Sequence, residues 1–511
     1  MMIPQEMVVA KSEVESTVAQ LWQFIQDSAR QATAAHVVEE ELFRKLLALG
    51  RQLYAQFLAL QGTGDVGERF VLPDGRSLRR LEETHPRSLL TIFGEFLLDR
   101  AVYGTREGQA IEAAPLDARL QLPESKFSHL LQSWDQLVAT EQPYGQVSQV
   151  LEMILGVSQH VDSLERMSRG MSASAEEFCW SQAAPPAAEE GEILVESADG
   201  KGVPIRHAAD APPIRDHEHR CGPKPDRKRM ATVAAVYSVD RFVRTPEQVL
   251  EALFHDPQAA RPDDLPQRPR PQHKRTYARL DDDPRLPNDQ PVNGAAAAFG
   301  WLEQQVRARL ATRNQPVEVV CVMDGQPSLW ELRERFQSDL PTVQILDLLH
   351  VTSRLWKAAH LFHPGDLPAA EAFVREQAGQ ILAGGVKSVI HSLRSRATRR
   401  QMGPANRRSL EVICNYFAKN RDRMRYDEYL RRGYPIASGV IEGACRHVVK
   451  DRLERTGMSW TPTGAQALLH LRAIATSKQW DAYHQYRVEQ ETNRLYPYRS
   501  QLNPLEWSLA A

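Results

Sequence analysis

The sequence predicts an α/β fold in its second half, interrupted by a helical block and preceded by a mainly helical region. From residue 192 onward, apolar runs of strand length alternate with helical patterns, which is typical of a sheet with crossover helices. Residues 1–60 place leucine and phenylalanine at three- and four-residue spacing, which predicts amphipathic helices. Residues 351–432 show helical periodicity and no convincing strand.

Length and composition indicate a folded protein of more than one domain. The 511 residues exceed the size at which one hydrophobic core usually stops growing. The hydrophobic fraction of 42% and the charged fraction of 25% are ordinary globular values. No stretch approaches the roughly 18 apolar residues of a membrane span, and the first residues lack a secretory pattern. We therefore expect a cytoplasmic protein with no membrane partner.

The cysteines argue against a disulfide framework and against a zinc site. Five are present, and none forms a CxxC pair. An odd, scattered set fits reduced thiols. They are Cys179, Cys221, Cys321, Cys414 and Cys445.

The N-terminal region, residues 1–180, is predicted to hold helices around a small sheet. The apolar and β-favouring residues of segment 70–104 predict that sheet. Within 124–170, one helix ends near Ile154, a turn follows at Gly156, and Ser158 can cap a second helix, which makes a helix-turn-helix candidate. Its second helix could enter a DNA major groove, and an ordinary helical hairpin is an equally good interpretation.

The α/β core is predicted to begin after a linker at 181–191, rich in proline, alanine and glutamate. Its first part spans 192–350. EILVESADG reads as a strand that ends on a carboxylate, KGVPIR as a short strand that pairs back, and RMATVAAVYSVDRFVR as a third strand. A segment rich in proline and arginine, 256–292, predicts an irregular insert. VEVVCVMDG and TVQILDLLH then supply two more strands, each preceded by a helix.

The remaining elements are helical. Residues 351–432 are predicted to form an all-helical insertion, and 433–480 to return to the core as two helices. Residues 481–511 are predicted to form a C-terminal tail.

Basic residues gather in runs, although the net charge is only -2. Such runs are either solvated faces or the electrostatic footprint of nucleic acid, and the sequence leaves both interpretations open. The runs lie at 220–229, 394–408, 421–432 and 446–455.

Three carboxylates form the candidate catalytic set. Asp199 and Asp324 each follow an apolar strand and precede a glycine. Asp-Gly is common turn chemistry, but catalytic groups also gather at the carboxyl ends of parallel strands. Glu442 falls in the first turns of a helix that Ser438 can cap, in a stretch where glycines leave space around it.

Converging carboxylates repel each other by about 1 to 4 kcal/mol per close pair, so a fold gathers three of them only with a cation to offset the repulsion. All-oxygen ligands select Mg²⁺ or Mn²⁺. Two such ions can activate an attacking oxygen and stabilise a leaving oxygen, which is phosphodiester chemistry.

The segments ESADGKGVPI, CVMDGQPSLW, LDLLHVTSRLWKAA, YPIASGVIEGACRHVVKDRLERTGMSWT and GAQALLHLRA resemble the bacterial ISKra-type insertion-sequence transposases of the DDE superfamily. The resemblance covers about 192–476 and is most specific in its last block. It implies a ribonuclease H-like core, split by a helical insertion, with Asp199, Asp324 and Glu442 as catalytic residues and ligands of two Mg²⁺ or Mn²⁺ ions.

Asp347 and His350 resemble a C/D-x-x-H signature of related transposase groups. Asp347 also follows a strand, so it rivals Asp324 as the second ligand, and we favour Asp324 because its Asp-Gly after the fourth strand matches the pattern. His350 is an auxiliary residue that orients a carboxylate or contacts DNA, or else an ordinary residue at the start of a helix.

The resemblance further implies a DNA transposase that acts on transposon ends and target DNA as a homodimer or larger assembly, associated with the nucleoid. Arg446, Lys450 and Arg452 would face phosphates. Trp460 would stack on DNA or, as the better interpretation, pack as an anchor. The cysteine-rich stretch that members often carry is missing, so end recognition is expected to fall to the helix-turn-helix candidate.

Two other functions remain open from the sequence. One is a ribonuclease H-like nuclease or resolvase that cuts without strand transfer. The other is a transposase-derived DNA-binding protein with inert chemistry, which the presence of all three carboxylates disfavours.

Overall fold

The computed structural model describes residues 11–106, 110–206, 228–255, 267–281, 293–455 and 457–502. The chain divides into two compact units: unit 1 is Met1–Ser174 with Trp480–Ala511, and unit 2 is Ala175–Gln479. No helix within these described ranges is long and apolar enough to cross a membrane. Most of the basic run at 220–229 lies outside the described residues.

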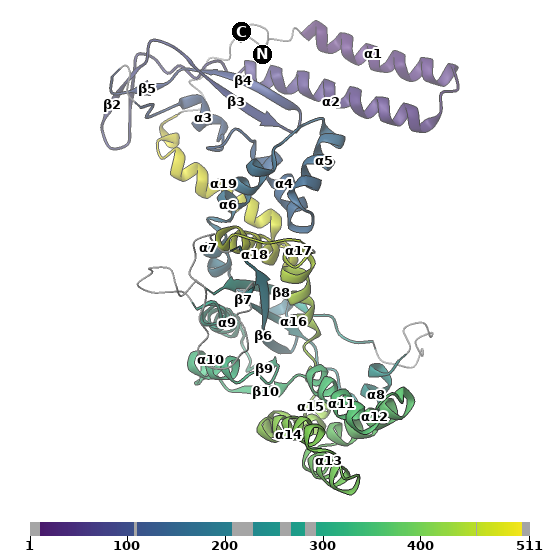
Figure 1. The fold of residues 1–511 in the computed structure, drawn as a ribbon. Helices are drawn as coiled ribbons and strands as arrows, with labels where there is room; N and C mark the ends of the chain where they lie inside the picture. Colours follow the sequence, from purple (N-terminus) through teal and green to yellow (C-terminus); the bar gives the residue numbers. More distant parts are fainter. Residues whose placement is uncertain are drawn as a thin grey trace. The chain divides into compact units, whose positions relative to one another are not determined.

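Unit 1 begins with a pair of antiparallel helices, α1 (Lys11–Arg30) and α2 (Ala35–Ala59), which lie side by side (Figure 1). A three-stranded sheet and a two-stranded sheet follow within the region where the sequence predicts a small sheet. The strands are β1 (Arg69–Val71), β2 (Ser77–Arg80), β3 (His85–Thr91), β4 (Gly94–Arg100) and β5 (Tyr103–Gly104).

The helix-turn-helix candidate lies in a group of three packed helices, whose shared core includes Ala139, Val147 and Leu164. The turn is longer than predicted, because Gly156 adopts a left-handed conformation and the chain stays non-helical as far as His160. His160, and not Ser158, is the N-cap residue, so the predicted cap is wrong. The helices are α4 (His129–Glu141), α5 (Tyr144–Leu155) and α6 (Val161–Ser172), and they follow α3 (Pro115–Leu120).

The segment predicted as a C-terminal tail contains a helix, α19 (Trp480–Leu495), that belongs to unit 1. The indole N–H of Trp480 donates a hydrogen bond to Ser133 Oγ at 3.0 Å. The hydroxyl of Tyr496 donates to the carbonyl of Leu122 at 2.7 Å. Unit 1 is therefore built from both ends of the described chain.

Unit 2 is organised around one mixed five-stranded sheet of order β10-β9-β6-β7-β8. β6–β7 and β7–β8 pair antiparallel, whereas β9 and β10 run parallel to β6. This mixed sheet agrees with the predicted α/β class. The strands are β6 (Ile193–Pro204), β7 (Lys228–Val239), β8 (Gln272–Leu280), β9 (Glu318–Met323) and β10 (Thr342–Leu346).

Two sequence predictions about this sheet are wrong. β6 does not end at Asp199, because Asp199 pairs with Val233 and the antiparallel ladder continues to Pro204 opposite Lys228. The insert predicted as irregular contains β8, in which the consecutive residues Thr276, Tyr277 and Ala278 are buried. Long-range pairing with β7 creates both features, and local turn and proline statistics do not report it.

Helices cover both faces of the sheet, with α9 and α10 on one side and α16 to α18 on the other (Figure 1). The side of α16 and α18 shares a core with Val233, Ala235 and Ala278. These helices are α9 (Gly294–Ala311), α10 (Pro327–Gln337), α16 (Gly439–Ala444), α17 (Asp451–Leu453) and α18 (Pro462–Thr476). Two shorter helices, α7 (Ala175–Ser181) and α8 (Pro246–Leu253), complete this part.

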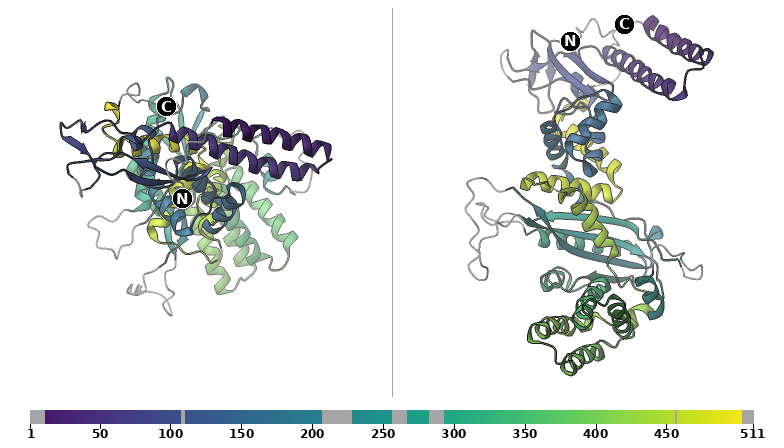
Figure 2. Two further views of the ribbon diagram at one scale, coloured as in Figure 1. Left: turned by 90° about the horizontal axis from the view of Figure 1, so that it is seen from above. Right: turned by 45° about the vertical axis from the view of Figure 1, so that its right-hand side comes forward.

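The block between β10 and α16 is helical, as predicted (Figure 2). Its buried residues, among them Leu355, Phe373, Leu393 and Phe417, form one core with residues of β6, β7, β9 and β10. The block is thereby fixed against the sheet edge at which the candidate residues lie. Its helices are α11 (Leu348–Phe362), α12 (Leu367–Leu382), α13 (Val386–Arg399), α14 (Pro404–Lys419) and α15 (Tyr426–Arg431).

Candidate active site

Asp199 lies within β6, and Asp324 and Asp347 directly follow the neighbouring strands β9 and β10. The parallel registers pair Glu196 of β6 with Cys321 of β9, and Met323 of β9 with Leu346 of β10. Continuing each register places Asp199 beside Asp324 and Asp324 beside Asp347. The backbone N–H of Asp347 donates to the carbonyl of Met323 at 2.9 Å, which extends the ladder to the last of these positions. The carboxyl ends of β9 and β10 and the neighbouring part of β6 therefore present a row of acids.

Asp199 points into a partly desolvated environment. Its Oδ1 accepts the backbone N–H of Gly200 at 2.7 Å, and its Oδ2 lies 3.5 Å from the thiol of Cys445. Burial raises the pKa of Asp199, and the negative charge of Asp324 raises it further. A cation that approaches such an acid stabilises its ionised form, which burial and the neighbouring charge disfavour.

Asp347 is fully buried and holds two elements together. It is the N-cap of α11, where Oδ1 accepts the backbone N–H of Leu349 at 3.1 Å. The same oxygen accepts the backbone N–H of Ser438 at 3.0 Å, at the start of α16. Burial opposes its ionisation, but the hydrogen bonds from His350, Ser438 and Leu349 outweigh that effect and lower the pKa of Asp347.

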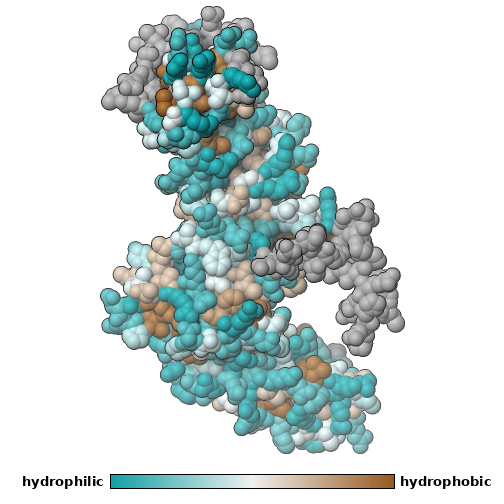
Figure 3. All heavy atoms as spheres, turned by 90° about the vertical axis from the view of Figure 1, so that its left-hand side faces the viewer, coloured by the Kyte–Doolittle hydropathy of each residue, from teal (hydrophilic) through white to brown (hydrophobic). Residues whose placement is uncertain are grey.

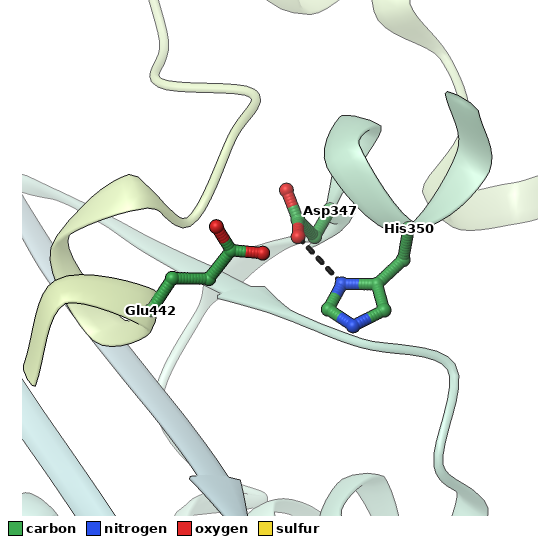
Figure 4. A group of neighbouring side chains, drawn as sticks. All are labelled: Asp347, His350 and Glu442. Atoms are coloured by element: carbon green, nitrogen blue, oxygen red, sulfur yellow. Dashed lines mark hydrogen bonds and ion pairs between the residues drawn. The ribbon is translucent and has the colours of Figure 1, made fainter. Parts of the chain in front are cut away.

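His350 is tied to Asp347 and surrounded by negative charge. Its Nδ1 lies 2.6 Å from Asp347 Oδ2 (Figure 4). The hydrogen bond to Asp347 raises the pKa of His350 against the opposing effect of burial, and the charges of Asp347, Asp324 and Asp199 add to the rise. The neighbouring acids therefore favour the protonated form of the imidazole.

Glu442 reaches the same place from α16, on the opposite side from Asp347 and His350 (Figure 4). One ligand atom each of Asp347, His350 and Glu442 lies within 4.8 Å of the others. Burial raises the pKa of Glu442, with further contributions from the charges of Asp347 and Asp199. A Cβ added at Gly439 or Gly443 would meet no atom within 4 Å, so neither glycine position of this helix is crowded.

The structure thus brings all five residues of the predicted catalytic and auxiliary set to one sheet edge. Among the described residues, the group whose ligand atoms lie within 4.8 Å of one another contains Asp347 and not Asp324, so distance alone favours the rival that the sequence ranked second. The hydrogen bonds of the two aspartates favour Asp324 as the second metal ligand. Its Oδ1 accepts the backbone N–H of Gln326 at 2.9 Å, and no donor reaches its Oδ2 within the described chain, whereas both oxygens of Asp347 are occupied.

The helix that carries Glu442 is not a regular α-helix. Residues Cys445–Lys450 form a π-helical segment between α16 and α17. The wider turn moves Lys450 away from the face that α-helical spacing predicts, although Arg446 and Lys450 both remain exposed. Arg446 pairs with Asp451 at 3.3 Å.

Arg452 and Trp460 pack with each other inside unit 2. Arg452 is only 1% exposed, and its guanidinium lies 4.9 Å from the centre of the Trp460 ring. This burial corrects the expectation that Arg452 faces phosphate. The indole N–H of Trp460 donates to the carbonyl of Leu453 at 3.0 Å, and the residue pairs with Ile205 through its backbone.

Sequence reasoning did not single out Tyr416 of α14, which lies against the loop after Asp324. A Cβ on Gly325 would lie 2.3 Å from the Tyr416 ring, so only glycine permits this approach. Burial raises the pKa of Tyr416 to about 12, and the charge of Asp324 adds to the rise. The guanidinium of Arg354 lies 4.7 Å from the centre of the same ring. In the sequence, Gly325 is the residue that could have indicated this contact, because a glycine after a strand marks either a turn or a close contact.

Comparisons with known proteins add little to this geometry. No family profile matches the chain, and no curated protein matches it. Three chains of solved structures match. One belongs to a Drosophila P element transposase strand transfer complex, with 11% sequence identity, 73% of this chain and 84% of that chain covered, and a TM-score of 0.23. A likeness at that TM-score does not bear on the function of this chain.

Proposed function

We propose that this chain is a DNA transposase of the DDE type, whose unit 2 is a ribonuclease H-like core that cleaves and joins DNA with two divalent cations. The observation that carries the proposal is the row of Asp199 and Asp324 on adjacent strands, with Glu442 facing it from a helix. The mixed sheet, its two helical layers and the helical block before the helix of Glu442 support the proposal, because the resemblance to ISKra-type transposases implies a core split by a helical insertion.

The residues fit a pair of hard cations. Asp199, Asp324 and Glu442 offer carboxylate oxygens, and the pKa values of Asp199 and Glu442 are raised partly by their acidic neighbours. Neither Gly439 nor Gly443, on the helix of Glu442, is crowded. Bound here, Mg²⁺ or Mn²⁺ ions would activate the attacking oxygen and stabilise the leaving oxygen of a phosphodiester.

Asp347 has a positioning role in this proposal. Its hydrogen bonds join the start of α11 to Ser438, one residue before the helix that carries Glu442. It also holds His350, whose raised pKa favours a positively charged imidazole beside the acids. His350 can then donate a hydrogen bond to a phosphate oxygen from Nε2, while Nδ1 stays on Asp347.

The test is a cleavage assay with supercoiled plasmid that carries the DNA flanking the gene. We expect nicked and linear products with Mg²⁺ or Mn²⁺ and none with EDTA. Asp199→Asn and Glu442→Gln should each reduce cleavage on the order of 10³-fold or more, because each removes a charged ligand and leaves the shape unchanged. Asp422→Asn, at a 92% exposed side chain, is the matched control and should cleave normally.

A joining assay separates strand transfer from simple hydrolysis. Precleaved ends of the element, incubated with Mg²⁺ and a target plasmid, should become covalently attached to the target. Cleavage without attachment would support the nuclease or resolvase alternative. Cleavage that persists at the wild-type rate in Asp199→Asn would refute the metal-dependent site.

A further inference from the structure

The helix that carries Glu442 also carries a thiol that contacts Asp199. Glu442 and Cys445 are three residues apart, which places them on the same side of the helix. One ligand atom of Glu442 lies within 4.8 Å of ligand atoms of Asp347 and His350. The thiol of Cys445 donates a hydrogen bond to Asp199 Oδ2 at 3.5 Å. One helix therefore reaches the row of acids at two points.

Cys445 makes this contact from inside an apolar core. The face of the chain in Figure 3 is mainly hydrophilic, with apolar residues in small separate patches. Cys445 has the opposite setting, because it is only 5% exposed and shares a core with Ile441, Val448 and Val233. A buried cysteine usually acts as a small apolar side chain. The hydrogen bond to a carboxylate therefore gives Cys445 a polar role that its surroundings do not require.

Asp199 needs such a donor because it lies within a strand. In a turn, the backbone N–H two residues later can orient an aspartate, as the N–H of Gln326 does for Asp324. The ladder of β6 with β7 continues beyond Asp199, so its backbone stays extended. Its Oδ1 accepts the N–H of the next residue, Gly200, at 2.7 Å, and its Oδ2 accepts the thiol of Cys445. One donor on each oxygen fixes the orientation of the carboxylate.

The thiol is compatible with a cation on the same carboxylate. A carboxylate oxygen has two lone pairs, so Oδ2 of Asp199 can accept the thiol and still bind a metal ion. The hydrogen bond also joins β6 to the helix of Glu442, and so it links the two carboxylates that would share the cations. Groups that hydrogen-bond a metal ligand fix its orientation, and their loss typically weakens metal binding about 10- to 100-fold.

We propose that Cys445 is a positioning residue that orients Asp199 toward the divalent cations and holds it in place relative to Glu442. The inference rests on the proposed function, in which Asp199 and Glu442 are the metal ligands.

The test measures Mn²⁺ binding by the full-length protein without DNA, by electron paramagnetic resonance of the free ion. Cys445→Ala should weaken Mn²⁺ binding about 10- to 100-fold, because the donor to Asp199 is lost. It should raise the Mg²⁺ concentration for half-maximal cleavage by a similar factor and change the rate at saturating Mg²⁺ less. Cys445→Ser keeps a donor and should bind Mn²⁺ within about 3-fold of wild type.

Cys414→Ala is the matched control, because Cys414 is a buried cysteine in the core of the helical block, and it should bind Mn²⁺ like wild type. If Cys445→Ala does not fold, Cys445→Val replaces it, because valine keeps an apolar side chain and lacks the donor. Wild-type affinity in Cys445→Ala or Cys445→Val would overturn the proposal. Binding by Cys445→Ser as weak as that of Cys445→Ala would also overturn it, because the serine hydroxyl can still donate.

The binding measurement separates this inference from the proposed function. Protein that binds Mn²⁺ with the expected differences among the Cys445 variants, but does not cleave DNA, would support the role of Cys445 and refute only the DNA chemistry. Wild-type protein that binds no Mn²⁺ would overturn both.

Discussion

At the scale of single residues, the site distinguishes acids that can accept a cation from acids that are already satisfied. Asp347 is fully buried, and both of its oxygens accept hydrogen bonds from the protein. Asp324 uses one oxygen to accept the N–H of Gln326 and remains partly exposed. Neighbouring carboxylates can therefore have different roles even when their spacing is similar.

Because Asp324 and Asp347 differ in their hydrogen bonds and burial, replacing each by the isosteric asparagine should have unequal effects. Asp324→Asn should reduce metal-dependent cleavage on the order of 10³-fold or more with little change in melting temperature, because it removes a charge from a partly exposed ligand. Asp347→Asn should reduce cleavage roughly 10- to 100-fold and lower the melting temperature, because it weakens the contacts that orient His350 and Ser438. Single-turnover rates and thermal unfolding measure both effects. The opposite ranking of the two cleavage rates would contradict the assignment.

A buried acid in unit 1 predicts a pH dependence of stability. Burial raises the pKa of Asp135 to about 7, although Gln159 donates a hydrogen bond to it at 2.7 Å. The folded state therefore keeps a proton that the unfolded chain releases above about pH 4, so the stability of unit 1 falls between about pH 4 and 7 and then levels off.

Asp135→Asn mimics the protonated acid, so the stability of the variant should not fall over this pH range. Its gain in melting temperature over wild type should be larger at pH 8 than at pH 5 by roughly 5 °C. Asp162→Asn, at an exposed position in the first turn of α6, should show no such trend. An equal gain for Asp135→Asn at both pH values would show that the buried carboxyl is not protonated.

At the scale of secondary-structure elements, the sequence predicted what is local and missed what depends on distant pairing. β9 was recognisable because it is a nearly continuous apolar run, as strands buried on both faces require, and β10 because Val343, Ile345 and Leu346 favour a strand. β8 was missed because its partly buried positions carry charge, including Lys274 and Arg275, and because prolines lie near it in the sequence. Asp199 was expected at a turn, since the statistics of Asp-Gly cannot report that β7 continues beside it.

The candidate site follows the same rule. Asp324 and Glu442 were selected from local signals, a strand end and a glycine-rich helix start, whereas Asp199 was selected from a strand end that the structure does not have. The burial of Arg452 and the contact of Tyr416 with Gly325 depend on tertiary packing, and so does the π-helical turn after Ala444. Helical periodicity shows that a helix is amphipathic, but not which partner each face meets.

The contact of α14 with the loop after Asp324 predicts coupling between two substitutions. Gly325→Ala should lower the melting temperature and the cleavage rate, because the new Cβ would overlap the Tyr416 ring. Adding Tyr416→Leu removes the ring and should recover a large part of the lost melting temperature. A double-mutant cycle with Tyr416→Leu alone measures this coupling. Strictly additive effects would mean that the ring and the glycine do not meet.

At the scale of the whole molecule, the chain is two units, and the first needs residues from both ends of the described sequence. Tyr483 is fully buried, and the hydroxyls of Tyr496 and Tyr498 bond to the backbone near α3. Trp480 contributes a further buried anchor through its hydrogen bond to Ser133. α19 is therefore part of the core of unit 1, and not a detachable tail.

Ending the chain after Gln479 should unfold unit 1 and leave unit 2 folded. Limited proteolysis should then degrade residues 11–174 quickly, while a fragment near 175–479 persists, because only unit 1 loses buried aromatic contacts. Ending the chain after Leu502 keeps all of these contacts and is the control. Protection of residues 11–174 in the shorter chain would contradict this role of α19.

Because α19 completes the core of unit 1, its late position in the chain also affects folding during translation. The ribosome must add the 305 residues of 175–479 after Ser174 before Trp480 emerges, which takes about 15 to 60 s at ordinary translation rates. During that interval, unit 2 can complete its folding while the earlier part of the chain waits with its apolar surface uncovered. A message broken before codon 480 would thus yield the carboxylate-bearing unit attached to an unfolded leader, a product that cellular proteases remove efficiently.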